Sequence, residues 1–463
     1  MTKKNGAAVA AVLAAVALSP SARANGRFPA AQQIVPSPHD PNVLALMATF
    51  GVEISQDNGA NWDWVCETAV GYMSNDNPML GITQSGNVLI GAFTGLGITT
   101  NLGCAWTLPT ANIAGPVTDL VVLKSDPHSA LVLASKYLAQ DDAGAATYTT
   151  TIYATHDDGA TFTPVGNPLD PEILPATIEV APSDGQRVYV SGTRRVNGAP
   201  TNVLLASTDG GQTFKETDYA AVGTDAGVTD RDPYIAAVDP GDPNRVYIRQ
   251  DNIDGTRLLV SDDGLATTRE VWRAAGSLVG FALSPDGSKV FVGSDMDGLR
   301  VADKTALDFT KQVWNGQVLC LAFQGSRLLA CSNEASGFAV GASNDQGVTW
   351  TPLLHLGCVR GPLACGPNSQ VTIACSPNWP AQQQTLGGPD PTCAADAGTG
   401  TGGGGDGGGT TTPGTPGSKG CSCSAAGSGG MGAWLAGAVA LAGGIGLGAR
   451  RRARSRRGLG VRG

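Results

Sequence analysis

The sequence predicts an all-β fold, a seven-bladed β-propeller, from three observations. One octapeptide recurs along the chain at intervals of roughly 50 residues, a spacing typical of four-stranded propeller blades. Each interval also contains a short β-branched run that follows a turn with Pro or Gly. Before the extreme C-terminus, no long segment shows a sustained apolar period of 3.6 residues, so long helices are not expected there.

The octapeptide has the pattern Ser-x-Asp-x-Gly-x-x-aromatic, and its clearest copy runs from Ser343 to Trp350. An Asp in a turn accepts hydrogen bonds from backbone N–H groups a few residues later, and the Ser or Thr hydroxyl can bond the same carboxylate. The glycine supplies a positive φ, and the aromatic residue starts the next strand and buries a large area. Structural roles are therefore predicted for Ser55, Asp57, Gly59, Trp62, Asp157, Gly159, Phe162, Asp209, Gly211, Phe214, Asp345, Gly347 and Trp350.

Weaker copies of the octapeptide fill the gaps between the clear ones. The second copy has Asn101, Gly103 and Trp106, with Asn in place of Asp. The fifth contains Asp263 but has its glycine one residue early, and the sixth retains only Asp303 and a displaced Phe309. The copies then start at 55, 99, 155, 207, 261, about 301 and 343, which predicts seven units. The β-branched runs, which are expected to form the second strand of each blade, also number seven.

The octapeptide resembles the Asp-box, also called the BNR repeat, of sialidases, sortilin-type (VPS10-like) receptors and several glycoside-hydrolase propellers. In those families the motif lies in hairpin turns at the blade periphery, so the resemblance implies structural and not catalytic aspartates. Arg27-Phe28-Pro29 echoes the arginine motif that opens the sialidase propeller. However, no further arginines with a Tyr and a Glu can be assigned, and seven units depart from the six-bladed sialidase form. No catalytic residue is assigned, and the glutamates are expected on solvated loops and strand faces, among them Glu172, Glu179, Glu216 and Glu270.

No metal site and no cofactor are expected. Two of the four histidines, His39 and His128, lie in turns, and His156 occupies a variable position of an octapeptide. Residues Asp295 to Gly298 resemble the start of a calcium loop, but the remaining ligands and the closing Glu are missing, which favours a hairpin turn. The chain has no P-loop, dinucleotide fingerprint or GxSxG elbow. Without the N-terminal signal and the C-terminal arginines its net charge is −19, so nucleic acid is not an expected partner.

The N-terminus has the three regions of a secretory signal peptide. Lys3 and Lys4 precede an apolar stretch from Ala7 to Leu18, and an Ala-Arg-Ala triplet ends at Ala24. The apolar stretch is too short to span a membrane, so we expect cleavage after Ala24 and an exported mature protein. The alternative is a short N-terminal helix of the folded domain.

The ten cysteines indicate disulfides, because an exported chain enters an oxidising compartment. A bridge between neighbouring blades is expected for Cys66 and Cys104, and a bridge across a hairpin turn for Cys320 and Cys331. Zinc binding is the alternative, but no CxxC pair is present. Four further cysteines follow the last octapeptide and allow three connectivities among themselves: Cys358, Cys365, Cys375 and Cys393.

After Cys393 the composition changes abruptly. Residues 394–420 are almost all Gly, Thr, Ala and Pro and are predicted to form a flexible linker. Next come Cys421 and Cys423, an apolar run of about 20 residues, and an arginine cluster, which together predict a transmembrane-type helix with the C-terminus in the cytoplasm.

This C-terminal tail resembles the MYXO-CTERM sorting signal of myxobacterial surface proteins. The resemblance implies recognition by a sorting protease, with Cys421 or Cys423 as the processing and anchoring residue, and display at the cell surface or outer membrane. An ordinary type I membrane anchor is the alternative.

The sequence therefore predicts five segments and favours a binding protein. The hypothesis is a surface-anchored propeller that binds a glycan or a protein partner through loops at one face. The alternatives are a glycoside hydrolase of sialidase-like or xyloglucanase-like type, and an assembly factor for a membrane complex. The segments are a signal peptide (1–24), the propeller (25–356), a Cys-rich closing segment (357–393), the linker (394–420) and the sorting tail (421–463).

Overall fold

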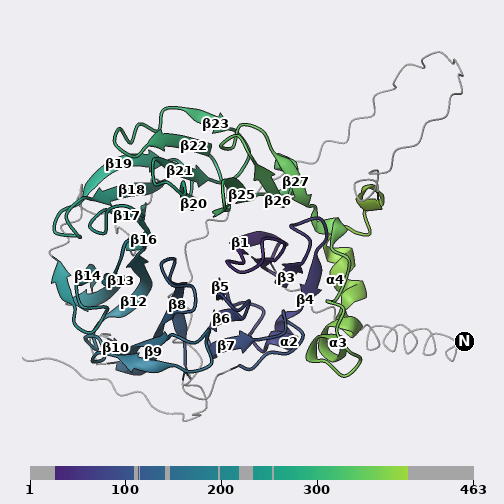
Figure 1. Cartoon of the computed structure of the whole chain (residues 1–463), viewed down its shortest axis with the longest axis horizontal. Coiled ribbons are helices and arrows are strands. Elements are labelled where there is room, and N and C mark those ends of the chain that lie inside the picture. The colour runs from purple at the N-terminus through teal and green to yellow at the C-terminus, as the bar shows by residue number, and fades with distance from the viewer. Residues whose placement is uncertain are drawn as a thin grey trace, which may run out of the picture. The chain divides into compact units, whose positions relative to one another are not determined.

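A computed structural model shows seven antiparallel β-sheets arranged as the blades of a ring (Figure 1). It describes residues 27–394 except 109–112, 114, 141–145, 197–198, 218–232 and 253–254. Each sheet is built from consecutive strands, with the first strand of each blade lining the centre of the ring. The predicted all-β, seven-bladed propeller is therefore confirmed.

The strands of the first four blades follow the sequence order within each sheet. Blade 1 has β1 (Ala31–Pro36), β2 (Leu44–Ala48), β3 (Gly51–Ser55) and β4 (Asp63–Val65), and blade 2 has β5 (Met79–Ile82), β6 (Val88–Ala92) and β7 (Gly95–Thr99). Blade 3 has β8 (Val117–Val122), β9 (Ala130–Gln140), β10 (Ala146–Thr155) and β11 (Thr163–Val165). Blade 4 has β12 (Leu174–Ala181), β13 (Asp184–Val196), β14 (Ala199–Ser207) and β15 (Lys215–Thr217).

The last three blades repeat the same order. Blade 5 has β16 (Pro233–Val238), β17 (Val246–Asn252), β18 (Gly255–Ser261) and β19 (Arg269–Ala274). Blade 6 has β20 (Leu278–Leu283), β21 (Lys289–Ser294), β22 (Gly298–Asp303) and β23 (Gln312–Trp314), and blade 7 has β24 (Cys320–Gln324), β25 (Arg327–Cys331), β26 (Val340–Ser343) and β27 (Thr351–Leu354). The β-branched runs form the second strand of each blade, as the pattern predicts.

The helices are short and most of them follow the last blade. They are α2 (Glu67–Val70), α3 (Gln370–Cys375) and α4 (Trp379–Thr385), with 3-10 turns at Glu334–Ser336, Leu356–Cys358, Ser376–Asn378 and Pro391–Ala394. Figure 1 places α3 and α4 against the outside of blade 1. Among the described residues, no helix is both long and apolar enough to cross a membrane. The predicted transmembrane-type helix, Ala24, Cys421 and Cys423 lie outside the described residues.

Blade 2 differs from the predicted four-stranded pattern. In place of a fourth strand, it has a single antiparallel β-bridge between Ile98 of β7 and Thr107. The neighbouring residue Trp106 is instead bonded by one side chain of the closing segment: its backbone N–H donates to Gln370 Oε1 (2.5 Å), and its carbonyl accepts from Gln370 Nε2 (3.1 Å). The glutamine therefore takes the place of a strand partner at this edge.

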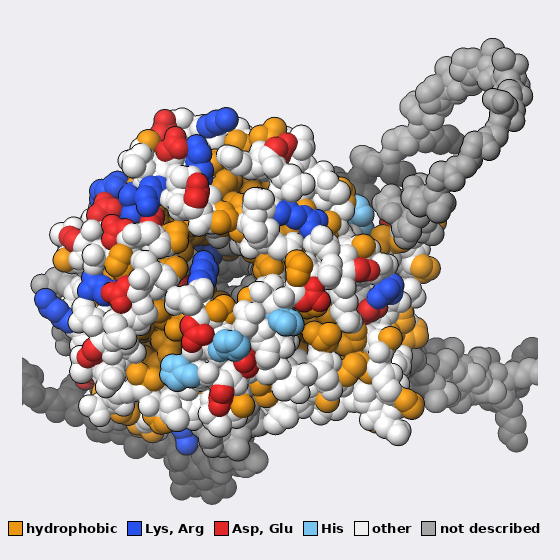
Figure 2. Space-filling view, viewed as in Figure 1, with side chains coloured by type: hydrophobic (Ala, Val, Ile, Leu, Met, Phe, Trp, Pro, Cys, Tyr) orange, Lys and Arg blue, Asp and Glu red, His pale blue; other side chains and the backbone are white. Residues whose placement is uncertain are grey.

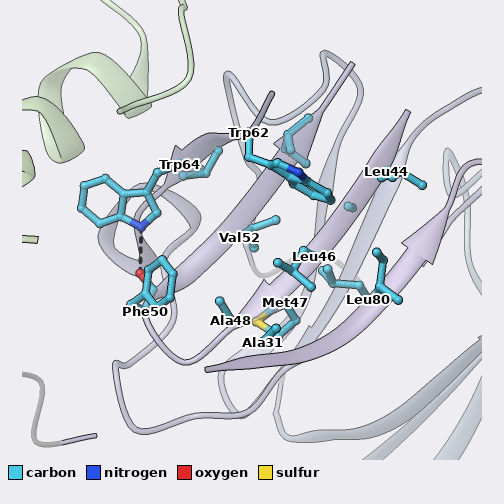
Figure 3. Close-up of a cluster of buried hydrophobic side chains, with 14 of the residues drawn as sticks. Ala31, Leu44, Leu46, Met47, Ala48, Phe50, Val52, Trp62, Trp64 and Leu80 are labelled. Atoms are coloured by element: carbon cyan, nitrogen blue, oxygen red, sulfur yellow. Dashed lines mark hydrogen bonds between the residues drawn. The ribbon is translucent and has the colours of Figure 1, made fainter. Parts of the chain in front are cut away.

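The hydrophobic core lies between neighbouring blades. Most of the buried clusters combine side chains of two adjacent blades, as Leu133 of blade 3 and Ile178 of blade 4 do. The largest cluster joins blades 7, 1 and 2 with the closing segment. Figure 3 shows part of it, in which Trp64 Nε1 donates to the carbonyl of Phe50 (2.8 Å). Each blade is thus stabilised mainly by its neighbours, because a single sheet buries too little area alone.

Polar side chains also link the inner strands of neighbouring blades. Asp119 of β8 accepts a hydrogen bond from the backbone N–H of Ile178 in β12 (2.9 Å). Thr177 of β12 in turn accepts from Ile235 in β16 (3.2 Å). Gln33 of β1 accepts in the same way from Leu80 of β5, and Thr256 of the third strand β18 accepts from the N–H of Leu278 in β20. These bonds satisfy backbone groups that the ladders of a single blade leave unpaired.

The ring closes without exchange of a strand between the first and last blades. Blade 7 contacts blade 1 through side chains: Trp62 Nε1 donates to the carbonyl of Leu353 (3.0 Å), and Arg327 donates to Asn58 Oδ1 (2.7 Å). The chain then turns back across the outer edge of blade 1. There the N–H of Trp64 donates to Gly361 (2.7 Å), and the N–H of Leu363 donates to Trp64 (2.8 Å). The closing segment therefore adds a parallel extension to β4.

Four disulfides join the cysteines of residues 27–394, and two of them correct the expected pairing. Cys320 and Cys331 are bridged across β24 and β25, as predicted. A bridge between Cys66 and Cys104 was the expectation, but the structure pairs Cys66 with Cys375 and Cys104 with Cys365. Of the four cysteines of the closing segment, only Cys358 and Cys393 pair with each other. The reason is the path of the closing segment, which crosses blades 1 and 2.

The two disulfides from the closing segment to blades 1 and 2 are expected to contribute more to the free energy of unfolding than the Cys358–Cys393 disulfide does. Replacing both Cys104 and Cys365 with Ser should lower the free energy of unfolding by about 2–5 kcal/mol, because the bridge closes a loop of 261 residues. Denaturant unfolding monitored by tryptophan fluorescence measures this change. The double Ser variant of Cys358 and Cys393, whose bridge spans 35 residues, is the control. A larger loss in the control would contradict this assignment.

Candidate functional site

The octapeptides form compact hydrogen-bonded turns between the third and fourth strands. In the seventh copy, Ser343 Oγ donates to Asp345 Oδ1 (2.7 Å), and the N–H of Thr349 donates to the same oxygen (2.9 Å). The bonds from Thr349, through its side chain first and then its backbone, lower the pKa of Asp345 to about 2. Gly347 has a φ of +88°, and a Cβ there would lie 2.2 Å from Leu299 of blade 6. The same Ser or Thr to Asp bond occurs in the copies that start at Ser55, Thr155, Ser207 and Ser261.

The fifth octapeptide keeps the turn without its glycine. The N–H of Leu265 donates to Ser261 Oγ (2.9 Å), which is the bond that Gly59 makes to Ser55 in the first copy. Leu265 therefore occupies the glycine position, and it has a φ of +75° while being buried. A non-glycine residue is strained at such a φ. The glycine that comes early in the sequence, Gly264, takes the position before it.

The octapeptides and the turns between first and second strands lie on the same face of the ring, which we call the octapeptide face. Figure 2 shows histidine side chains gathered beside the central hollow. His128 Nδ1 lies 2.7 Å from Asp158 Oδ2, and this hydrogen bond raises the pKa of His128. His156 Nδ1 lies 2.8 Å from the hydroxyl of Ser129. The described residues contain no group of three or more side chains that could hold a metal ion.

Three inner strands bring an acidic and aromatic cluster together at the axis. Asp119 (β8) is 6% exposed, and burial raises its pKa to about 7 although the N–H groups of Ile178 and Leu120 donate to it. Burial, and then the charge of Asp119, raises the pKa of Glu179 (β12) to about 8. Arg249 stacks on the ring of Tyr234 (β16), 3.8 Å from its centroid. Glu179 lies on a face of the inner strand β12 and is partly exposed.

The axial cluster does not form a free pair of catalytic carboxylates. Both oxygens of Asp119 accept backbone N–H bonds, one within blade 3 and one from blade 4. A carboxylate used in this way holds two blades together and is nearly inaccessible to a substrate. The cluster therefore supports a structural role for Asp119.

The face opposite to the octapeptides carries exposed apolar side chains. We call it the loop face, and it consists of the hairpins between second and third strands and the connections between blades. Nine large hydrophobic side chains are exposed in the described part of the chain. Two lie elsewhere, Val348 in an octapeptide and Ile373 in α3. The other seven belong to the loop face, either in these loops or in the ends of the strands beside them: Phe28, Met73, Phe93, Tyr137, Leu138, Val279 and Met296.

Charged residues hold several of these loops in place. The guanidinium of Arg27 donates to Asn77 Oδ1 (2.5 Å) and to the carbonyls of Thr49, Ser74 and Asp76, which fixes the loops that carry Phe28 and Met73. Arg27 therefore stabilises loops, in contrast to the carboxylate-binding arginine that it echoes in sialidases.

The predicted hairpin turn at Asp295–Gly298 is also present on this face, between β21 and β22. Asp297 Oδ2 accepts from the N–H groups of Ala275 (2.9 Å) and Gly276 (3.2 Å), and Asp295 Oδ1 accepts from Ser277 (2.8 Å). These carboxylates fix the connection between blades 5 and 6. They leave Met296, between them, 72% exposed.

Comparisons with known proteins yield only distant structural similarities. No protein-family model matches the chain, and no curated protein does. The chain is similar to an ancestral GH74 enzyme at 13% identity, over 72% of this chain and 55% of that chain, with a TM-score of 0.38. YCF48 from Cyanidioschyzon merolae matches at 13% identity over 66% and 93% of the two chains, with a TM-score of 0.41. The extracellular domain of a protein from B. thetaiotaomicron matches at 11% over 68% and 38%, with a TM-score of 0.45.

The chain thus spans about half the length of the GH74 enzyme that it matches. At these identities and scores, the similarities assign neither a family nor an activity. The four disulfides are consistent with an exported protein, because such bonds persist in oxidising compartments.

The turn chemistry predicts graded effects of substitution at Asp345. Replacement with Asn retains an oxygen that can accept from Ser343 and Thr349, as Asn101 does for Thr99 and Ala105 in the second octapeptide. Replacement with Ala removes the acceptor. We expect Asp345→Ala to lower the melting temperature by a few degrees and Asp345→Asn to lower it less. Calorimetry of both variants measures the difference, and equal effects would contradict the proposed hydrogen bonding.

The raised pKa of Glu179 predicts a stability that falls as the pH rises. The folded protein retains a proton on this side chain up to about pH 8, whereas the unfolded chain releases it near its ordinary value of 4.5. Between these pH values the folded state binds more protons, so stability is lost. Glu179→Gln should therefore be more stable than the parent at pH 8, by on the order of 1 kcal/mol, and equal to it at pH 4. Urea unfolding at the two pH values tests this, and a pH-independent difference would refute it.

Proposed function

We propose that the protein is an exported, surface-displayed binding protein that holds a protein partner on its loop face. The observation that carries this proposal is the position of the exposed apolar side chains, seven of which belong to this face. Apolar and aromatic side chains dominate the energetically important part of protein interfaces. An exposed group of them on one face is therefore best accounted for by a partner.

The rigidity of the loops supports the same proposal. Arg27, which precedes Phe28, donates to backbone carbonyls of the loop that presents Met73. Asp295 and Asp297, on either side of Met296, accept from the backbone of the connection between blades 5 and 6. A surface that is already ordered loses little conformational entropy on binding. Display at the cell surface, through the sorting tail, remains a prediction from the sequence. The hydrolase alternatives are less well supported, because Asp119 is committed to bonds between blades.

Site-specific photo-crosslinking in producing cells tests the binding face. A photoreactive amino acid placed at Phe93 or Met296 is expected to give a discrete crosslinked protein product. The same label at Val348, which is 55% exposed on the octapeptide face, is the matched control. Equal products from both faces, or none from the loop face, would contradict the proposal.

The partner captured in this way then allows a quantitative test. Phe93→Ser and Met296→Ser should each weaken its binding about tenfold, because loss of a central apolar contact at an interface costs more than about 1 kcal/mol and about 1.4 kcal/mol corresponds to a factor of ten. Val348→Ser should leave the affinity unchanged. Surface plasmon resonance with the purified partner measures the three affinities.

A further inference from the structure

The closing segment contains a shallow cavity, open to solvent, that lies apart from both faces of the ring. The cavity has a volume of about 290 Å³ and is lined by Pro362, Leu363, Cys365, Thr372, Ser376 and Trp379. These residues come from the extension along β4 and from the helical part that follows, on the outside of blade 1 (Figure 1). We propose that this cavity binds the ring of a neutral sugar.

The lining chemistry fits that class of ligand. A sugar ring presents C–H groups on its faces and hydroxyls on its rim, so a site for it combines an aromatic surface with hydroxyl and N–H groups. Trp379 supplies the aromatic surface, and Leu363 and Pro362 supply apolar walls. Thr372 and Ser376 contribute hydroxyls. Ser376 is exposed and Trp379 is partly exposed, so both side chains are accessible to a ligand.

The charge of the cavity argues against an acidic sugar. No Lys, Arg, Asp or Glu lines it. The arginine of the same segment, Arg360, is paired with Asp63 of β4, with its Nε 2.9 Å from Asp63 Oδ1. A carboxylate-bearing sugar would therefore find no cation in the cavity to pair with its charge. The cavity is therefore suited to an uncharged ring.

The cavity is held in shape before any ligand binds. Trp379 packs against Trp64 with ring centroids 5.5 Å apart, and Trp64 is itself fixed by its bond to Phe50. The two bridges to blades 1 and 2 end at Cys365, which lines the cavity, and at Cys375, which precedes Ser376. A preorganised site of this kind loses little binding energy to ordering.

Ligand titrations of the full chain, oxidised to its four disulfides, test the proposal. The probes are D-glucose, D-galactose, D-mannose, D-xylose and N-acetyl-D-glucosamine, with N-acetylneuraminic acid as the charged comparison. Saturation-transfer NMR should detect at least one neutral sugar, and its dissociation constant follows from titration. No binding of any neutral sugar, or binding of the charged sugar alone, would overturn the proposal.

Variants then locate the site. Trp379→Ala should weaken the binding at least tenfold, Trp379→Phe should restore part of it, and Ser376→Ala should weaken it severalfold without disturbing the fold. Ile373→Ser is the matched control, because Ile373 is exposed in the same segment but does not line the cavity. Circular dichroism and a thiol assay confirm that each variant is folded and oxidised. Sugar binding that persists unchanged in both Trp379→Ala and Ser376→Ala would refute the assignment.

This site is independent of the proposed partner-binding face. Phe93→Ser and Met296→Ser should not change the affinity for the sugar. Conversely, Trp379→Ala should not change the crosslink obtained from Met296. The two proposals can therefore fail separately.

Discussion

The structure depends on closing a ring whose first and last blades share no strand. Many of the bonds that join blade 7 to blade 1 are made by side chains, including Trp62 and Arg327, and such contacts are weaker than a continuous ladder. The closing segment compensates for this. It extends β4 through backbone bonds at Gly361 and Leu363, and it joins the largest buried cluster, which spans three blades. Two disulfides then fasten it to blades 1 and 2. This arrangement also forms the cavity around Trp379 and places Gln370 against Trp106 at the outer edge of blade 2.

The number of blades could be predicted because its signal is local. An octapeptide needs only its own residues to form its turn, and the Ser343 to Asp345 bond spans two positions. Even the imperfect fifth copy keeps the turn, since Leu265 adopts the glycine conformation. The paired cysteines of β24 and β25 were predictable for the same reason, as they flank one hairpin. Local chemistry thus determines each unit.

The features that combine distant segments could not be predicted in this way. Cys66 and Cys375 are 309 residues apart, and nothing near either cysteine indicates that the chain returns to blade 1. Asp119 and Glu179 meet only because inner strands of consecutive blades converge on the axis. The loop face has a similar origin, since the exposure of Phe93 or Met296 depends on how the hairpins are oriented and not on their sequence pattern. Candidate sites in such a fold combine residues from different blades, so the local sequence does not reveal them.

The position of the closing segment also constrains how the molecule is made. A ribosome completes blades 1 and 2 first, but their cysteines at 66 and 104 have partners only at 375 and 365. Until those residues emerge, the early blades carry two thiols and an uncovered outer edge at β4. Premature oxidation of these thiols, or pairing of this edge with other strand edges, would compete with attachment of the closing segment. Blades 1 and 2 are therefore synthesised first, but they receive their disulfide partners only when the closing segment has been made.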